Sequence, residues 1–223
     1  MKRYAVAIVA IVIALALGVW LYQWYRVQSS RDAVVAAIKD ASERLRASWP
    51  REANEPAIDF EAHARAVDAH VLALRSMNTS SIRELGDAAD DYLVTAREIL
   101  RRQSAMQGSR ERLSKDVEIL ARHLQSDRGR AAWPQQAVRL KSAVDTDLRD
   151  YRIASESYAS LLKSLPASQA KVAPHLDRAS IIDENAAKDA GTRALDALAR
   201  TDENIRQLTR LDAYRGGRAA IRR

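Results

Sequence analysis

The sequence contains no cysteine and only seven glycines and five prolines among 223 residues. Without cysteine the chain cannot form disulfide bonds, Cys-x-x-Cys motifs or the thioether anchor of a lipoprotein. With so few helix-breaking residues, long segments run uninterrupted, and the abundant Ala, Leu, Arg and Glu favour helices. The composition therefore predicts an all-α protein.

Sequence patterns typical of β-sheets and of enzymes are missing as well. No segment alternates apolar and polar residues with a period of two, so we predict no sheet. Phosphate-binding loops, zinc-protease motifs and calcium loops are absent. Ser-x-x-Lys occurs at residues 160–163 and 168–171, but the companion motifs of serine acyltransferases do not. We predict a protein that is not an enzyme and has no catalytic residues, cofactor or metal ligands.

One long apolar run lies near the start of the chain, at residues 4–25, with Gln23 as its only plainly polar residue. As a helix it would be about 33 Å long, enough to cross a hydrocarbon core of about 30 Å. The small-x-small sequence at residues 14–16 also permits a cleaved signal peptide. The run continues past that site to Tyr25, and its last residues are aromatic, as at a membrane interface. We therefore favour a transmembrane signal-anchor at residues 1–26 over a cleaved signal peptide.

The charges beside this run predict its orientation. Lys2 and Arg3 precede it, which favours a cytoplasmic N-terminus. The Lys and Arg residues at 26–46, counted alone, favour the opposite orientation, and both orientations stay open. We predict a single-pass protein of the inner (cytoplasmic) membrane of a bacterium, with its bulk in the periplasm.

The remaining chain is predicted to form an elongated, up-down antiparallel helical bundle over residues 27–215 with coiled-coil-like seams. It is either one bundle or two stacked bundles that share the longest helix. A basic tail at residues 216–223 follows the bundle. The helices are expected at residues 27–48, 59–77, 82–126, 132–165 and 180–215.

Breaks and seams in the sequence set these boundaries. No Gly or Pro lies between Val19 and Trp49, so the first helix is expected to continue from the anchor into the bundle. Apolar residues spaced alternately by three and four continue across Gly108, which predicts one helix over 82–126. Pro166 and the Gly pair at 216–217 are expected helix ends. Capping boxes are expected at residues 81–84 and 180–183.

Two histidines, His63 and His70, lie seven residues apart in the apolar seam of the second bundle helix, with Met77 seven further on. Seven residues rise about 10.5 Å along a helix, too far for two of these side chains to share one ion without ligands from other helices. We interpret them as half-buried seam residues, with pH sensing or ligand contact as the alternative.

Three tyrosines, Tyr92, Tyr151 and Tyr158, fall on seam positions of the third and fourth bundle helices. Core packing is the favoured interpretation, with each hydroxyl group reaching a polar partner or water. The alternative is a small polar-lined ligand pocket between these two helices.

The end of the chain is rich in arginine. Such a run is usually solvated, but here it could also contact anionic lipid or a cell-wall polymer. We expect no nucleic-acid binding for a domain outside the cytoplasm. The arginines concerned are Arg206, Arg210, Arg215, Arg218, Arg222 and Arg223.

Residues 68–76, DAHVLALRS, resemble a stretch in the double all-helical ligand-binding sensory domains of bacterial histidine kinases. An anchor followed by long antiparallel helices is similar too. The resemblance implies a ligand-sensing module. The 223 residues contain no second span and no kinase or other output domain, so such a module would need a separate signalling partner.

Two functions are therefore expected from the sequence. The first is a membrane-anchored interaction or scaffold protein of the bacterial envelope, which binds a partner protein or a second copy of itself. The alternative is an extracytoplasmic ligand-sensing module that acts through a separate signalling partner.

Overall fold

The computed structural model describes residues 2–49, 58–126 and 133–220, and within these it describes no side chains for residues 2–12, 14 and 211–220. All regular elements in the described residues are helices, which confirms the all-α class. The elements are α1 (Lys2–Ala47), α2 (Phe60–Ser76), η1 (Ser80–Ile82), α3 (Arg83–Gln125), α4 (Trp133–Val172), η2 (Ala173–His175), η3 (Arg178–Ser180) and α5 (Glu184–Ala220).

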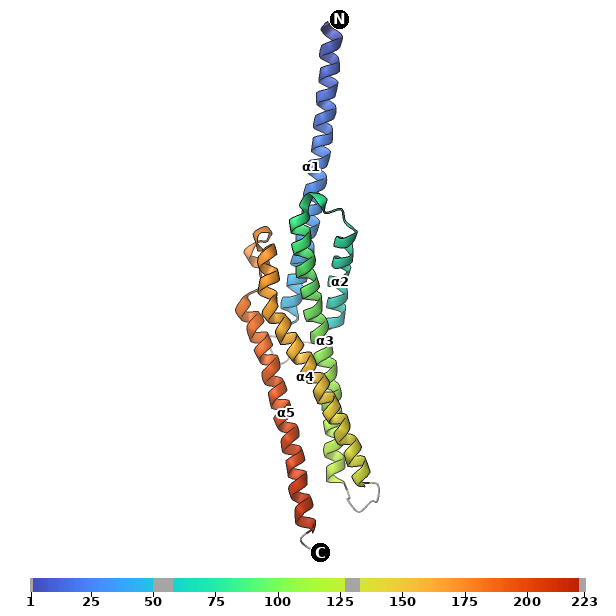
Figure 1. Cartoon of the computed structure of the whole chain (residues 1–223), viewed down its shortest axis with the longest axis vertical. Coiled ribbons are helices and arrows are strands. Elements are labelled where there is room, and N and C mark those ends of the chain that lie inside the picture. The colour runs from blue at the N-terminus through green and yellow to red at the C-terminus, as the bar shows by residue number, and fades with distance from the viewer. Residues whose placement is uncertain (1, 50–57, 127–132, 221–223) are drawn as a thin grey trace.

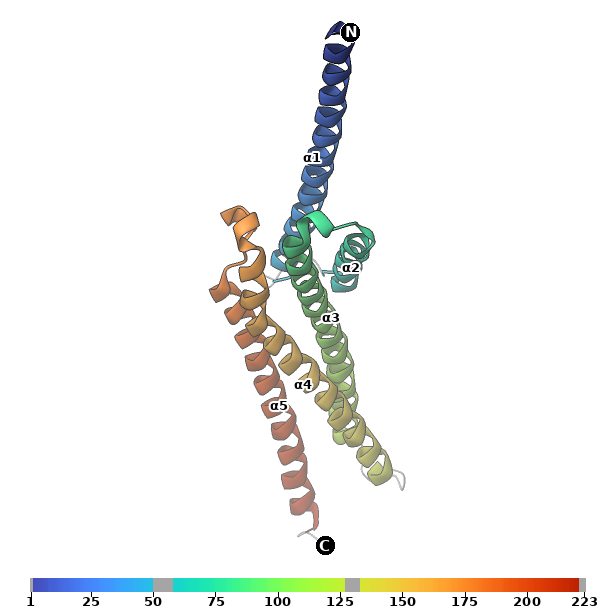
Figure 2. The same cartoon turned by 45° about the horizontal axis from the view of Figure 1, so that its top comes forward.

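The molecule is elongated, and successive long helices run in alternating directions along it (Figures 1 and 2). The start of α1 and the end of α5 lie at opposite ends. The first half of α1 projects alone beyond the other helices, and its second half packs beside α2 and α3 (Figure 1). As expected from the absence of Gly and Pro, α1 continues without a break from the apolar run into the bundle.

Two apolar clusters fill the bundle. The cluster nearer to the projecting part of α1, here called the proximal core, draws on all five long helices. Its largest side chains with no exposure are Ile38, Leu45, Tyr92, Leu93, Ile99 and Leu100. The distal core draws only on α3, α4 and α5, because α1 ends at the level of Gln103, whose side chain donates a hydrogen bond to the Ser48 carbonyl. Its buried residues are Leu113, Leu120, Val144, Tyr151, Leu198 and Ile205.

Gly108 does not interrupt α3, as the seam predicts. Ile99 and Leu100 before it and Leu113 and Leu120 after it are buried. This burial offsets the cost of about 1 kcal/mol for glycine in a helix.

Pro166 does not end α4, and the predicted end at residue 165 is wrong. The helix continues through Pro166 to Val172. Proline inside a helix costs roughly 3 kcal/mol. Leu162 and Leu165 before it and Val172 after it are buried in the proximal core, and that burial holds the chain in helical form. The α4 ribbon bends in its C-terminal part (Figure 2), as proline-containing helices do.

The predicted helix bounds leave residues 166–179 as the connection between α4 and α5, but the structure has a compact corner there that contains two 3₁₀ turns, η2 and η3. Gln169 binds the backbone of Ile182 twice: its Nε2 donates to the carbonyl at 2.9 Å and its Oε1 accepts from the amide at 2.8 Å. Asp177 accepts a hydrogen bond from the Ser180 amide. Lys39 of α1 pairs with Asp177 at 2.7 Å, so the corner is fixed to α1.

The predicted capping boxes do not form. Residues 80–82 make a 3₁₀ turn instead, and no side chain caps α3 at Ile82. α5 starts at Glu184 rather than at residue 180. At this start the side chain of Asp183 accepts a hydrogen bond from the Asn185 amide. α5 also runs past the Gly pair at 216–217, which was expected to end it, as far as Ala220.

Within the described part of the chain, no helix combines the length and apolar character needed to cross a membrane. The predicted anchor at residues 1–26 lies partly outside this part, because side chains are described there only at residue 13 and from residue 15 onward.

Candidate functional site

The two seam histidines of α2 lie in different surroundings. His70 Nε2 lies 2.8 Å from Asp40 Oδ2, and Arg44 Nε donates to the same oxygen at 2.6 Å. Burial raises the pKa of Asp40, but Arg44 and His70 together hold it below its usual value. His63 Nδ1 is buried without a hydrogen-bond partner among the described residues. His70 therefore links α2 to α1, and His63 is not part of that contact.

Tyr92 joins α3 to α1 inside the proximal core. Its hydroxyl group lies 2.7 Å from the Ser42 hydroxyl, which also donates to the Ile38 carbonyl. Burial raises the pKa of Tyr92 to about 12. At neutral pH the residue is a neutral phenol in a packed contact.

The other two tyrosines of α4 lie in separate cores, Tyr158 in the proximal and Tyr151 in the distal core. Burial raises the pKa of Tyr158 above its usual value. The Trp49 indole N–H has no hydrogen-bond partner of acceptable geometry among the described residues. It lies close enough to the Tyr158 hydroxyl to lower the pKa of Tyr158, which partly opposes the increase caused by burial.

The structure does not bring these five residues together. None of them lines either of the two pockets described below. Within the described residues, no three His, Asp or Glu side chains are placed to hold a metal ion. Ligand binding or pH sensing by these histidines and tyrosines stays a prediction.

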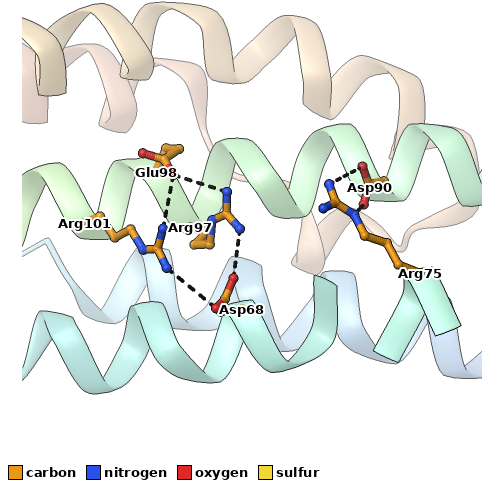
Figure 3. A network of polar contacts seen from close by, with 6 residues as sticks. All are labelled: Asp68, Arg75, Asp90, Arg97, Glu98 and Arg101. Carbon is orange, nitrogen blue, oxygen red and sulfur yellow. Dashed lines mark hydrogen bonds and ion pairs between the residues drawn. The ribbon is translucent and has the colours of Figure 1, made fainter. Parts of the chain in front are cut away.

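A network of charged side chains joins α2 to α3 (Figure 3). Arg97 of α3 donates to Asp68 of α2 at 2.8 Å and to Glu98 at 3.3 Å. Arg101 lies 3.6 Å from both carboxylates. The hydrogen bond from Arg97 is the main cause that lowers the pKa of Asp68. Sequence reasoning missed this network because its partners lie on two helices.

A second pair lies nearer the α2–α3 corner. Arg75 binds both carboxylate oxygens of Asp90, at 2.8 and 3.0 Å (Figure 3). This bidentate contact raises the pKa of Arg75. Arg75 and the network residue Asp68 both lie in the stretch that resembles a sensory domain. In this fold Asp68 and Arg75 each form an ion pair that joins α2 to α3.

An open groove of about 520 Å³ lies beside this pair, between the end of α2 and the start of α3. Three aspartates of α3 line it, but two of them have cationic partners: Asp90 pairs with Arg75 and Asp91 with Lys171. Asp87 is exposed. The groove is therefore a largely neutralised surface.

A pocket of about 390 Å³, here called the tip pocket, lies between the end of α3 and the start of α4. The rings of His123 and Trp133 stack beside it with centroids 5.1 Å apart. Trp133 Nε1 donates to the His123 carbonyl at 3.1 Å, and His123 Nε2 lies 3.1 Å from the Trp133 carbonyl. The sequence gives no sign of this contact, since nothing in the local pattern of His123 indicates a partner ten residues away.

The arginine-rich end of α5 is only partly described. Arg206 pairs with Asp202 at 2.7 Å, and Arg210 is exposed. The side chains of the other four predicted contacts lie outside the described residues: Arg215, Arg218, Arg222 and Arg223.

No protein-family model, curated protein or solved structure matches this chain. The resemblance to helical sensory domains accordingly stays a prediction.

Proposed function

We propose that this chain is a single-pass, membrane-anchored interaction protein of the bacterial envelope, with a cytoplasmic N-terminus and its helical body outside the cytoplasm. The observation that supports the proposal is the projecting part of α1. Among its described side chains, Leu15, Leu17, Leu21 and Trp20 are each more than half exposed. No other helix packs beside the ribbon of this part of α1 (Figure 1), and the described side chains from residue 15 to residue 26 are all exposed.

The distribution of these apolar residues favours lipid over a protein groove. A helix that docks on a protein has one apolar stripe and a polar back. Here adjacent residues such as Trp20, Leu21 and Tyr22 are all exposed, so apolar side chains face every direction. A surrounding of lipid tails is the environment that suits such a helix.

The aromatic residues that follow support the same placement. Trp20, Tyr22, Trp24 and Tyr25 have exposed fractions of 58–69% and gather where the helix approaches the bundle. Tryptophan and tyrosine prefer the headgroup level, where the ring is in apolar surroundings and its polar atom reaches water.

The body supports an interaction role. The side chains of the helical body fill both of its cores. The end of the body opposite the projecting part of α1 lies far from it (Figure 1). A partner protein or a second copy would contact the outer surface, where Leu72, Val138 and Ile153 are exposed.

The anchor is tested by fractionation of the full chain with a C-terminal reporter that is active only outside the cytoplasm. We expect a carbonate-resistant membrane fraction and an active reporter. The variant Leu15→Arg/Leu17→Arg, near the middle of the apolar run, should lose both, because two charges in the bilayer core cost about 2.5–3.5 kcal/mol each. The control Gln28→Glu/Ser29→Glu, which adds two charges at exposed positions of the same helix, should keep both, because acidic residues beside a span contribute little to its orientation. A soluble wild-type chain, or an inactive reporter, would overturn the proposal.

The interaction role is tested with photo-crosslinking residues at Leu72 and Ile153 in intact cells. A discrete adduct is expected, with twice the chain mass for self-association and another fixed mass for a partner. Exposed polar positions on the same helices, Arg65 and Glu156, serve as controls. No adduct, or equal adducts at all four positions, would contradict a specific interface.

A further inference from the structure

The tip pocket lies at the end of the α3–α4 hairpin, far from the projecting part of α1 (Figures 1 and 2). Its volume of about 390 Å³ falls within the range of roughly 300–1,000 Å³ typical of ligand sites. Seven described residues line it: Ile119, Arg122, His123, Ser126, Trp133, Gln136 and Leu140.

Two polar side chains of this lining can donate hydrogen bonds to a ligand: Arg122 carries a guanidinium group and Gln136 a side-chain amide. The Ser126 hydroxyl and His123 Nε2 already bind the carbonyls of His123 and Trp133. No carboxylate occurs among the described residues that line the pocket. Trp133 and Gln136 also belong to the first turn of α4, where the helix dipole favours negative charge.

The remaining lining is apolar and held in place. Ile119 and Leu140 come from facing helices, and the Trp133 ring lies flat against His123 at an interplanar angle of 18°. The two hydrogen bonds between Trp133 and His123 fix both rings before any ligand arrives. A preformed pocket of this kind loses little conformational freedom on binding.

We propose that the tip pocket binds a carboxylate that carries an aromatic or branched apolar group. Arg122 pairs with the carboxylate, and the apolar group packs against Leu140 and the Trp133 ring. The present partner of Arg122 is Glu118, 3.4 Å away and about two-thirds exposed like Arg122 itself. Such a surface ion pair is weak, so a better-placed carboxylate can replace it. This inference does not rest on the proposed membrane anchor.

The first experiment titrates the full chain in detergent micelles with phenylacetate, using its uncharged isostere phenylacetamide for comparison. Binding is followed through the indole N–H NMR signals, with that of Trp133 identified from Trp133→Phe. We expect a saturable shift of the Trp133 signal by phenylacetate, no shift of the Trp49 signal, and at least tenfold weaker binding of the amide.

Two variants test the residues. Arg122→Gln and the near-isosteric Gln136→Glu should each weaken phenylacetate binding at least tenfold, the first by removing the cation and the second by adding a repelling carboxylate. Arg110→Gln is the matched control, since Arg110 is exposed on the same helix and does not line the pocket. The proposal would be overturned if the acid and the amide bound equally well, or if Arg122→Gln and Arg110→Gln had equal effects. It would also be overturned if binding did not saturate at 10 mM phenylacetate, a concentration roughly tenfold above a millimolar dissociation constant.

A third comparison identifies the source of the carboxylate. A short peptide that ends in phenylalanine is titrated with a free and with an amidated C-terminus. If the free acid binds at least tenfold more tightly than phenylacetate, the pocket recognises a chain terminus. If it binds more weakly, the pocket recognises a small molecule.

Discussion

The proximal core draws on five helices and the distal core on three, and these three, α3, α4 and α5, contribute to both. In the proximal part, four residues of α3 within two turns are completely buried: Leu93, Ala96, Ile99 and Leu100. In the distal part, Leu113 and Leu120 are buried, but Val117 and Leu124 between and after them are only half-buried. The same apolar seam is thus covered to a degree set by the number of neighbouring helices.

The two cores also differ in their polar contacts. The proximal core encloses hydrogen bonds between helices, such as that of Ser42 with Tyr92, but also the Trp49 indole N–H, which has no partner of acceptable geometry among the described residues. Beside the distal core, Asp116 of α3 lies close enough to Asp147 of α4 to affect its pKa. Burial raises the pKa of Asp147, and Asp116 raises it further, while Arg112 lowers it. Because five helices rather than three bury its side chains, the proximal part is expected to be the more stable of the two.

The largest expected effect comes from matched cavities in the two cores. Leu100→Ala should lower the free energy of unfolding by about 3–5 kcal/mol, and Leu120→Ala by about 2–3 kcal/mol, because a cavity beside half-buried neighbours closes more easily. Urea denaturation followed by circular dichroism measures both. Equal losses, or a larger loss for Leu120→Ala, would remove the distinction between the cores.

A smaller effect is expected from two tyrosines. Tyr92→Phe should cost about 1 kcal/mol, because the Ser42 hydroxyl loses a buried partner. Tyr151→Phe should change stability by less than about 0.5 kcal/mol, since the Tyr151 hydroxyl makes no hydrogen bond within the described part of the chain. The same denaturation assay decides, and equal effects would contradict a polar contact specific to the proximal core.

The pH dependence of Tyr92 sharpens this comparison. Its pKa is raised from 10.0 to about 12, so the folded state favours the neutral phenol. The resulting stability is complete below about pH 10 and is lost as the pH rises toward about 12. The free energy of unfolding should thus fall more in the wild type than in Tyr92→Phe between pH 9.5 and pH 11. These two values lie about half a unit below and one unit above the usual tyrosine pKa. Parallel losses in both proteins would contradict the raised pKa.

The smallest effect is expected at Asp147. The pKa of Asp147 is raised above its usual value of 3.8, so the protonated carboxyl group stabilises the folded state. This stabilisation is complete below pH 3.8 and is lost as the pH rises through the pKa of Asp147 in the folded protein. Asp147→Asn should therefore stabilise the protein at pH 7, by up to about 0.5 kcal/mol, and have no effect at about pH 3, below the usual aspartate pKa. Asp145→Asn, at an exposed position of α4, is the control. An unchanged or lower urea midpoint for Asp147→Asn at pH 7 would be evidence against the raised pKa of Asp147.

Sequence reasoning succeeded where one helix carries the whole signal. The seam across Gly108 predicted α3 as one helix, and the lack of Gly and Pro after Val19 predicted the continuity of α1. It failed at Pro166 and at the Gly pair of α5, where local propensity indicates an end but the backbone continues as a helix. At Pro166 the buried leucines on one side and Val172 on the other outweigh the local cost.

The candidate sites show the same division. His70 and Tyr92 were identified by their register, but their partners Asp40 and Ser42 lie thirty or more residues away on α1. The tip pocket was not predicted at all, since its lining comes from two helices, the end of α3 and the start of α4. Side-chain spacing on one helix gives no distance to another.

The sequence alone determined the helical class, the long continuous helices and the apolar run at residues 4–25, because these depend on composition and on periodicity within one segment. Only the tertiary structure decided which seam positions are fully buried, where α4 ends, and that His123 and Trp133 meet beside a pocket. Burial and pairing depend on how many helices surround a position, and that number is a property of the packed bundle rather than of any one segment.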